Sequence, residues 1–229
     1  ETRAAEAERL AALGQIAAGL AHEIRNPLSS IAGAVQLLQT SVNDPEDREL
    51  CDIVRREAGR LEDLVSDMVD LSRPRPPHVE RTDISRVVDD VAELASRSGR
   101  ALGDVRVVRV GTKDPSFVLV DAGQLRQLVW NLVRNAVQAS VAGGEVRVRL
   151  ESRQRVVLSV EDDGVGIDER ARAQIFDAFY TTRSKGTGVG LAVVKRIADD
   201  HGFTVSVESG AGRGATFLVD LGPPLPPAE

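Results

Sequence analysis

The chain has 229 residues, of which 42% are hydrophobic, enough to fill the core of one large domain or two small ones. Its formal net charge of -6 and its aromatic content of 3% argue against nucleic acid and anionic membrane surfaces as partners. Cys51 is the single cysteine, which excludes an internal disulfide and a cysteine-cluster metal site and fits a reducing compartment.

The first predicted element is a long helix from about residue 3 to residue 40. Turn-forming residues at 41–47 (SVNDPED) end it, and a second helix follows through residues 50–71. Apolar or small residues recur at spacings of three and four along the first helix, as in a coiled coil or helical bundle: Leu10, Leu13, Ala17, Leu20, Ile24, Pro27, Ile31, Ala34 and Leu38. Because two such helices cannot bury both apolar stripes alone, we predict a homodimeric four-helix bundle; the alternative is a monomeric hairpin packed on a second domain.

His22 lies off this apolar seam, in the stretch LAHEIRNPL. It takes an f position of the heptad, which points away from the partner helix, so its imidazole could meet a visiting domain. Glu23 could hold the ring in one tautomer and take up a proton as a ring nitrogen attacks an electrophile, and Asn26 lies one turn later on the same face. The alternative is a solvated surface histidine. Pro27 favours a special role, since proline inside a helix costs about 3 kcal/mol.

A proline-rich stretch, SRPRPP at residues 72–77, ends the helical part and predicts a short, semi-rigid linker. We predict a second domain in which a mainly antiparallel sheet carries its helices on one face, an α+β sandwich. The predicted helices are 83–97, 121–139 and 189–201, and the predicted strands are 105–110, 117–120, 145–152, 155–162, 203–209 and 215–221. The fold class is thus multidomain, with an all-α hairpin at 1–72, a linker at 73–77, an α+β domain at 78–222 and a tail without core at 223–229.

Two asparagines four residues apart, Asn131 and Asn135, share one face of the predicted helix 121–139. Two amides at this spacing can ligate or orient hydrated Mg²⁺. A solvated polar stripe explains the pair about as well, because asparagine is common on exposed helix faces.

The stretch DDGVGI, residues 162–167, directly follows a predicted strand. Gly164 and Gly166 would let the backbone approach a planar ligand closely, and Asp162 could accept a hydrogen bond from an exocyclic amine such as that of adenine. Taken alone, the stretch is equally well a turn that contains glycines.

A third cluster, GTGVGL at residues 186–191, precedes a predicted helix and follows Arg183 and Lys185. Glycines at a helix N-terminus expose backbone N–H groups and the positive end of the helix dipole to phosphates. The cluster is neither a Walker loop nor a dinucleotide fingerprint, because it lacks both the Gly-Lys-Ser/Thr run and a βαβ unit. The preceding IFDAFYTTRSK mixes three aromatic residues with turn and basic residues, which suits a mobile lid over a nucleotide; the alternative is a loop whose aromatics fill the core.

In order, the motifs LAHEIRNPL, NLVRNA, DDGVGI and IFDAFYTTRSKGTGVGLAVV resemble those of the sensor histidine kinases of two-component systems, over nearly the whole chain. The resemblance implies a histidine phosphotransfer hairpin followed by an ATP-binding domain with the fold shared by gyrase-type and chaperone ATPases. It also implies autophosphorylation with ATP and Mg²⁺, phosphotransfer to an aspartate of a response regulator receiver domain, and phosphatase activity toward that regulator.

The resemblance assigns the roles of single residues. His22 would be the phosphoacceptor, Glu23 its acid–base partner, and Asn26 the residue that positions water for dephosphorylation of the regulator. Asn135 would bind Mg²⁺, with Asn131 supporting the metal and the triphosphate. In the nucleotide pocket, Asp162 would recognise adenine, and the remaining contacts would come from Gly164, Gly166, Phe176, Phe179, Arg183, Lys185, Gly186, Thr187, Gly188 and Gly190. Of these, the two phenylalanines would couple the lid to the helices, and Arg183 stands where a lysine is common.

The sequence starts in the middle of a helical pattern and contains no signal peptide and no apolar run of about 18 residues. We therefore expect a cytoplasmic piece of a longer protein, which contacts a membrane only through regions outside this sequence.

The rival interpretation is a nucleotide-dependent dimeric ATPase or scaffold in which His22 is only surface. The ATPases that the second domain resembles carry a general-base glutamate one turn before the metal-binding asparagine, and here that position is Asn131. An amide cannot accept a proton from water, so we expect slow ATP turnover in the absence of His22.

Overall fold

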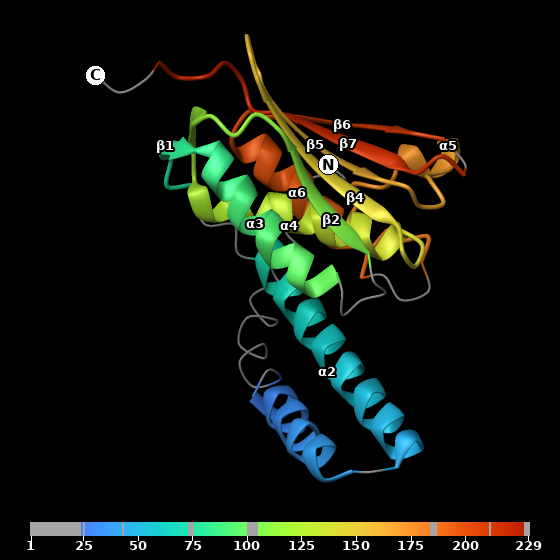
Figure 1. Ribbon diagram of the computed structural model, residues 1–229. Coiled ribbons are helices and arrows are strands. Elements are labelled where there is room, and N and C mark those ends of the chain that lie inside the picture. The colour runs from blue at the N-terminus through green and yellow to red at the C-terminus, as the bar shows by residue number, and fades with distance from the viewer. Residues whose placement is uncertain are drawn as a thin grey trace, which may run out of the picture. The chain divides into compact units, whose positions relative to one another are not determined.

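The computed structural model describes residues 24, 26–42, 44–72, 76–99, 105–183, 187–210 and 212–226 (Figure 1). The chain divides into two compact units, Glu1–Arg75 and Pro76–Glu229. Within the described ranges, no helix is long and apolar enough to cross a membrane.

The first unit is a helical hairpin in its described part. Residues 26–41 are helical, and α2 spans Pro45–Ser72. The turn is shorter than predicted, because Pro45 already starts α2, at a position where the missing N–H of proline costs no helical hydrogen bond. Asp44 caps this helix, since its Oδ1 accepts the backbone N–H of Glu46 at 2.8 Å. The hairpin is antiparallel, as Gln39 Nε2 donates to Asp52 Oδ1 over 2.8 Å.

Much of the predicted apolar seam stays exposed on this single hairpin. Leu28 and Ala58 are 8% and 4% exposed and are the buried hydrophobic residues of its described part. The exposed seam and partner-helix residues include Ile31, Leu38, Leu50 and Leu61, at 45%, 55%, 59% and 47%. A lone hairpin therefore leaves large apolar side chains of both helices in contact with water.

The second unit contains a five-stranded sheet in the order β2-β4-β5-β7-β6. Its strands are β2 (Arg106–Gly111), β4 (Glu145–Ser152), β5 (Val156–Asp162), β6 (Thr204–Ser209) and β7 (Ala215–Asp220). The last four pair antiparallel, and β2 joins β4 in parallel at one edge.

The prediction of one sheet is wrong for β3 (Phe117–Val120), which pairs antiparallel with β1 (Glu80–Asp83) in a separate two-stranded sheet. The four residues of β1, ERTD, show no apolar alternation, so sequence patterning could not find this partner strand.

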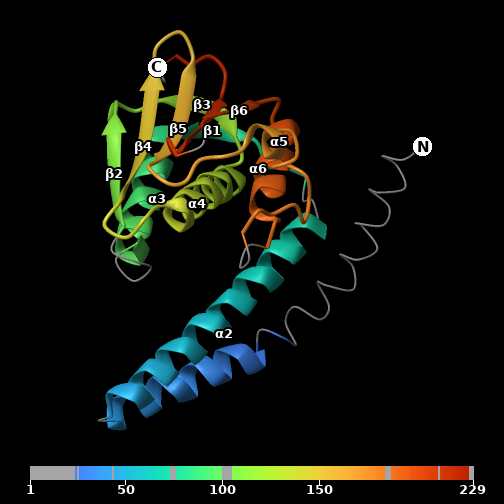
Figure 2. The ribbon, with the colours of Figure 1, turned by 90° about the vertical axis from the view of Figure 1, so that its right-hand side faces the viewer.

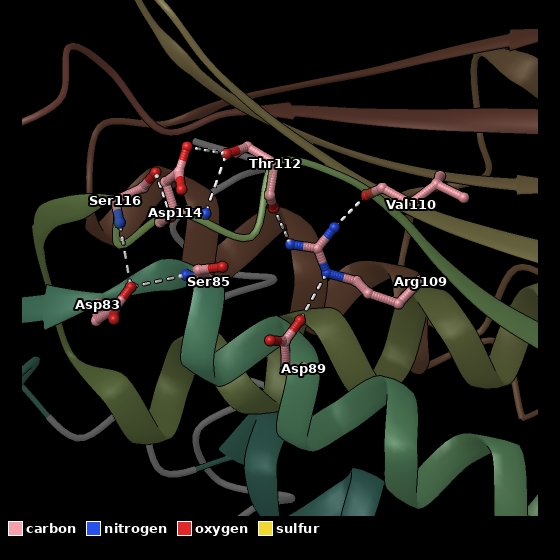
Figure 3. A network of polar contacts seen from close by, with 8 residues as sticks. All are labelled: Asp83, Ser85, Asp89, Arg109, Val110, Thr112, Asp114 and Ser116. Carbon is pink, nitrogen blue, oxygen red and sulfur yellow. Dashed lines mark hydrogen bonds and ion pairs between the residues drawn. The ribbon is translucent and has the colours of Figure 1, made fainter.

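A polar network between the two sheets holds the β2–β3 loop on α3 (Ile84–Gly99), as Figure 3 shows. Asp83 Oδ1 accepts the backbone N–H of Ser116 at 3.2 Å. Arg109 Nε lies 2.9 Å from Asp89 Oδ1 in an ion pair, and Arg109 Nη2 donates to the Thr112 carbonyl over 2.6 Å. These bonds fix the loop that leads from β2 to β3, the strand that pairs with β1.

Three helices cover one face of the five-stranded sheet (Figure 2): α3, α4 (Ala122–Ala139) and α6 (Gly190–Asp200). Alternate residues of β5, Val156, Leu158 and Val160, are fully buried on this face. The central helix α4 packs against β4 and β5 and has α3 and α6 beside it. A short helix, α5 (Glu169–Arg172), was not predicted.

The segment after β7 is not a free tail up to residue 226. Leu221 is 2% exposed, and the Leu225 N–H donates to the Phe117 carbonyl at 2.7 Å. Arg81 lies 4.0 Å over the Phe117 ring and donates to the Pro226 carbonyl. Residues 225 and 226 are thereby bound to the small β1–β3 sheet.

Candidate functional site

The candidate site of the second unit is built on α4. Asp121 caps this helix, because its Oδ1 accepts the N–H groups of Gly123 at 2.9 Å and Gln124 at 3.0 Å. Asn131 and Asn135 follow one turn apart on the same helix; Asn131 is 4% exposed and Asn135 is half-buried. The two amides therefore lie at a partly buried face of the helix rather than on a solvated stripe.

The N-terminus of α6 lies against this face. A Cβ placed on Gly190 would lie 3.3 Å from Arg134 Nη2 and 4.0 Å from Asn131 Oδ1, so the first residue of α6 is within van der Waals range of the Asn131 amide. Val189, at the N-cap position, makes no side-chain hydrogen bond to the first turn, and Thr187 Oγ1 accepts the Val189 N–H at 3.3 Å. An N-terminus without a side-chain cap presents N–H groups that can bind an anion such as phosphate.

Asp162 ends the buried strand β5 and is 5% exposed. Burial raises the pKa of its carboxyl above the ordinary value of 3.8, and hydrogen bonds from the N–H groups of Gly164 and Ala215 and the charge of Arg183 partly offset that rise. The Gly164 N–H lies 2.9 Å from Asp162 Oδ1. The site thus contains a desolvated carboxylate that can still accept a further hydrogen bond.

Close backbone packing explains the two glycines after Asp162. A Cβ on Gly164 would lie 2.3 Å from the carbonyl oxygen of Ala139, the last residue of α4. Gly166 has φ +75°, and a Cβ there would lie 2.1 Å from the Gly210 carbonyl. The Gly164 contact brings the loop after β5 to the C-terminal end of α4, one helical turn beyond Asn135.

The two predicted site phenylalanines have different surroundings. The Phe176 ring packs edge-on against Phe217 of β7, with centroids 6.4 Å apart. Phe179 is 52% exposed and has φ +67°, which is unusual for a bulky residue. Phe176 therefore anchors its segment to the core, whereas Phe179 presents an aromatic ring to solvent.

Arg183 reaches back from this segment to α4. Its Nη1 donates to the Asn135 carbonyl over 3.3 Å. Burial lowers the pKa of the guanidinium, and the charge of Asp162 opposes that shift. The guanidinium therefore contacts the backbone of the asparagine predicted to bind metal, and its charge acts on the carboxylate predicted to bind adenine. Lys185 and Gly186, predicted for the same cluster, lie outside the described residues.

The predicted catalytic residues belong to the first unit. Asn26 is exposed at the start of the described helix, and its carbonyl accepts a hydrogen bond from the Ser30 hydroxyl at 3.0 Å. Ser29 Oγ donates to Glu62 Oε1 over 2.8 Å and so joins this helix to α2. Two predicted residues lie outside the part of the chain that the structure describes: His22 and Glu23.

Sequence reasoning missed several supporting residues. Ala215 bonds Asp162 through its backbone, and Gly214 has φ +70°, where a Cβ would lie 1.9 Å from the Asp162 carbonyl oxygen. Backbone contacts between distant strands leave no signal in residue type. Asp121 did have a signal, as an aspartate at the first residue of the predicted helix 121–139.

Two family models match the chain. The model for the His Kinase A (phospho-acceptor) domain matches residues 12–77, and the model for the histidine kinase-, DNA gyrase B-, and HSP90-like ATPase matches residues 120–225.

Curated relatives cover nearly all of this chain. The signal transduction histidine-protein kinase AtoS of Escherichia coli (strain K12) is 36% identical over 96% of this chain and 36% of AtoS. The sensor histidine kinase ZraS of Klebsiella oxytoca is 37% identical over 95% of this chain and 47% of ZraS. Sporulation kinase C of Bacillus subtilis (strain 168) is 31% identical over 96% of this chain and 51% of the sporulation kinase. The chain therefore spans about a third to a half of the length of these relatives.

Solved structures give the same picture. Full-length ShkA in complex with AMPPNP is 30% identical, with a TM-score of 0.70 over 94% of this chain and 47% of ShkA. The mycobacterial sensor histidine kinase MprB is 30% identical, with a TM-score of 0.56 over 64% of this chain and 99% of that chain. ThkA in complex with the response regulator TrrA is 28% identical, with a TM-score of 0.65 over 94% of this chain and 63% of that chain.

Proposed function

This chain belongs to the sensor histidine kinases of two-component systems, and on that premise we propose that it is the phosphorylating core of such a kinase. The second unit binds ATP, and His22 of the first unit accepts the γ-phosphoryl group. An aspartate on a response regulator receiver domain then receives the phosphoryl group from His22.

The observation that carries this proposal is the convergence of Asp162 and Asn135 at the C-terminal end of α4, with Asn131 beside the N-terminus of α6. A buried carboxylate suits the exocyclic amine of adenine, because both its oxygens are acceptors. The N–H groups at the start of α6 suit phosphate oxygens. Together these groups bind and orient a purine nucleotide with its phosphates directed toward the start of α6.

The donor set also fits Mg²⁺. Among the described residues, no group of three or more His, Cys, Asp or Glu side chains is placed to hold a metal ion. Mg²⁺ commonly keeps its waters and binds through substrate phosphates with few protein ligands, so the amide of Asn135, supported by Asn131, is a sufficient protein contribution. When bound, the ion supplies charge neutralisation at the transferring phosphate.

Three residues of the first unit do the remaining chemistry. One nitrogen of the His22 imidazole attacks the γ-phosphorus. The carboxylate of Glu23 takes up the proton that the other ring nitrogen releases. Asn26 orients water when the regulator is dephosphorylated. Its exposed side chain near the start of the described helix supports this role.

The exposed apolar seam supports a homodimer. Ile31, Leu38, Leu50 and Leu61 would be buried if two hairpins formed a four-helix bundle. The stabilisation would come from removing these side chains from water at about 25 cal/mol per Å² of apolar surface.

Labelling with γ-³²P-ATP tests the proposal against the ATPase alternative. We expect label retained on the chain, stable in base and lost in acid, and absent from His22→Gln. Transfer of that label to a receiver domain would support the second step. Steady phosphate release without retained label would instead identify a plain ATPase.

A further inference from the structure

We propose that Asp121 is a positioning residue for autophosphorylation, because one of its carboxylate oxygens fixes the start of the second unit on the helix that carries Asn131 and Asn135. This inference rests on the proposed function. It extends that function by assigning the orientation of the phosphoryl donor to one hydrogen bond, between Asp121 and the backbone of His78.

The two oxygens of the Asp121 carboxylate have different partners. Oδ1 accepts the first N–H groups of α4, those of Gly123 and Gln124. Oδ2 accepts the backbone N–H of His78 at 2.9 Å. Burial would raise the pKa of Asp121, but these N–H groups hold it below 3.8, so the carboxylate that accepts them is ionised at neutral pH. Capping of α4 uses Oδ1 alone, so the bond at Oδ2 needs a separate explanation.

His78 provides the first backbone N–H of the second unit. This unit begins with Pro76 and Pro77, which have no backbone N–H. The first strand, β1, begins later in the chain. The bond to Asp121 therefore fixes the chain directly after the predicted linker 73–77 and before the first strand pairing.

A second contact holds Asp121 from the side of α6. The Asp121 N–H donates to His201 Nε2 at 3.1 Å, and His201 Nδ1 lies 2.9 Å from the Ile197 carbonyl. A carbonyl only accepts, so Nδ1 carries the proton and Nε2 is the acceptor. His201 is the C-cap residue of α6. Asp121 thus joins the start of the second unit to one end of α4 and one end of α6, the two helices proposed to bind the nucleotide.

This junction bears on phosphoryl transfer because the linker connects the second unit to the unit that contains His22. In such a reaction the protein contributes mainly orientation, and a displacement of about 1 Å can slow the reaction by about a hundredfold. With the bond between Asp121 and His78, the point where the linker meets the second unit is fixed on α4. Without it, the residues before β1 lengthen the flexible connection, which lowers the effective concentration of His22 at the nucleotide. Nucleotide binding itself does not use this connection.

Two substitutions remove the bond by different means. His78→Pro removes the N–H donor and leaves Asp121 intact. Asp121→Asn keeps one oxygen to cap α4, but its NH₂ group replaces the other oxygen and cannot accept the His78 N–H. The measurement is the initial rate of autophosphorylation of the full chain with γ-³²P-ATP at several ATP concentrations, with the Kd of ADP from NMR titration. In each variant we expect the rate at saturating ATP to fall about three- to tenfold, with the KM of ATP and the Kd of ADP unchanged.

His78→Ala is the matched control, because it keeps the backbone N–H and removes only an exposed side chain. Its rate should equal that of the wild type. The double variant His78→Pro with Asp121→Asn should be no slower than the slower single variant, because both substitutions remove the same bond.

Wild-type rates in both single variants, or the same loss in His78→Ala as in His78→Pro, would overturn this inference alone. A loss of ADP affinity in parallel with the rate would also overturn it, because the role of Asp121 would then be structural. A wild-type chain that retains no label would overturn the proposed function and this inference with it.

Discussion

Phe179 and Gly188 are joined at the base of the segment between them, where the Phe179 N–H donates to the Gly188 carbonyl at 2.9 Å and both residues have left-handed φ angles, +67° and +69°. A Cβ on Gly188 would lie 2.5 Å from the carbonyl carbon of Phe179. Only one of the two positions carries a glycine, so the conformational cost falls on the phenylalanine.

This cost predicts a difference between two variants that both remove the Phe179 ring. A left-handed conformation costs an L-residue roughly 1–2 kcal/mol, whereas glycine adopts it freely. Phe179→Gly should therefore be more stable than Phe179→Ala by about 1 kcal/mol in urea unfolding, after allowance for the greater freedom of glycine in the unfolded chain. Equal stability of the two variants would show that φ at this position relaxes without cost.

Asp162→Asn should weaken nucleotide binding without destabilising the fold at neutral pH. Burial raises the pKa of Asp162, so the folded chain holds this proton more tightly than the unfolded chain, and ionisation at neutral pH opposes folding. As pH falls toward 3.8, Asp162 becomes protonated, and the wild type regains the stability that ionisation had removed. The Asp162→Asn variant has no ionisable group at this position, so its stability does not change in this way. Any stability advantage of Asp162→Asn in denaturant unfolding should therefore shrink with falling pH; an advantage that grows would contradict the raised pKa.

Asp121 should show the opposite pH dependence. Burial alone would raise its pKa, but hydrogen bonds from the N–H groups of Gln124, His78 and Gly123 lower it below 3.8. Its contribution to stability is therefore complete above 3.8 and is lost as pH falls through the lower, folded-state pKa. Asp121→Ala should cost about 1 kcal/mol at neutral pH, because it removes the cap of α4, and Asp121→Asn should cost less, because asparagine also caps helices.

His22→Ala should eliminate retained label and leave little sustained ATP turnover. The reason lies in Asn131, whose amide occupies the position from which the related ATPases activate water and which has no proton affinity near neutral pH. The measurement is phosphate release over many turnovers beside the wild type. Release at the wild-type rate would favour the ATPase interpretation. Binding of ADP by His22→Ala at wild-type affinity is the control that the site remains formed.

Asn26→Ala should retain autophosphorylation and lose most phosphatase activity toward a phosphorylated receiver domain. A neutral amide one turn from His22 can orient water at an aspartyl phosphate docked there, but it has no part in attack by the histidine itself. Ser30→Ala is a suitable control, because it removes only the hydroxyl that bonds the Asn26 carbonyl. Full phosphatase activity in Asn26→Ala would remove this role.

Local pattern alone predicted most elements of the chain. The alternation in β4 and β5 and the helical period of α4 placed these elements to within a residue or two, because the side-chain period depends on neighbouring residues. The spacing of Asn131 and Asn135 likewise determined that both amides share one helix face. Patterning could not find β1, whose residues are polar, or the separate sheet that it forms with β3.

The site itself depended on contacts that sequence does not encode locally. Gly164 packs on the Ala139 carbonyl, Ala215 bonds Asp162, and Arg183 bonds the Asn135 carbonyl. Each contact joins segments that are distant in the chain and meet only in the folded structure. Residue types at 176 and 179 are identical, yet one phenylalanine packs on β7 and the other is exposed. Sequence by itself determined which chemical groups are present and on which local element each lies. Tertiary structure alone decided which of them meet and lose water, because desolvation and charge–charge attraction depend on distance in space and not on separation along the chain.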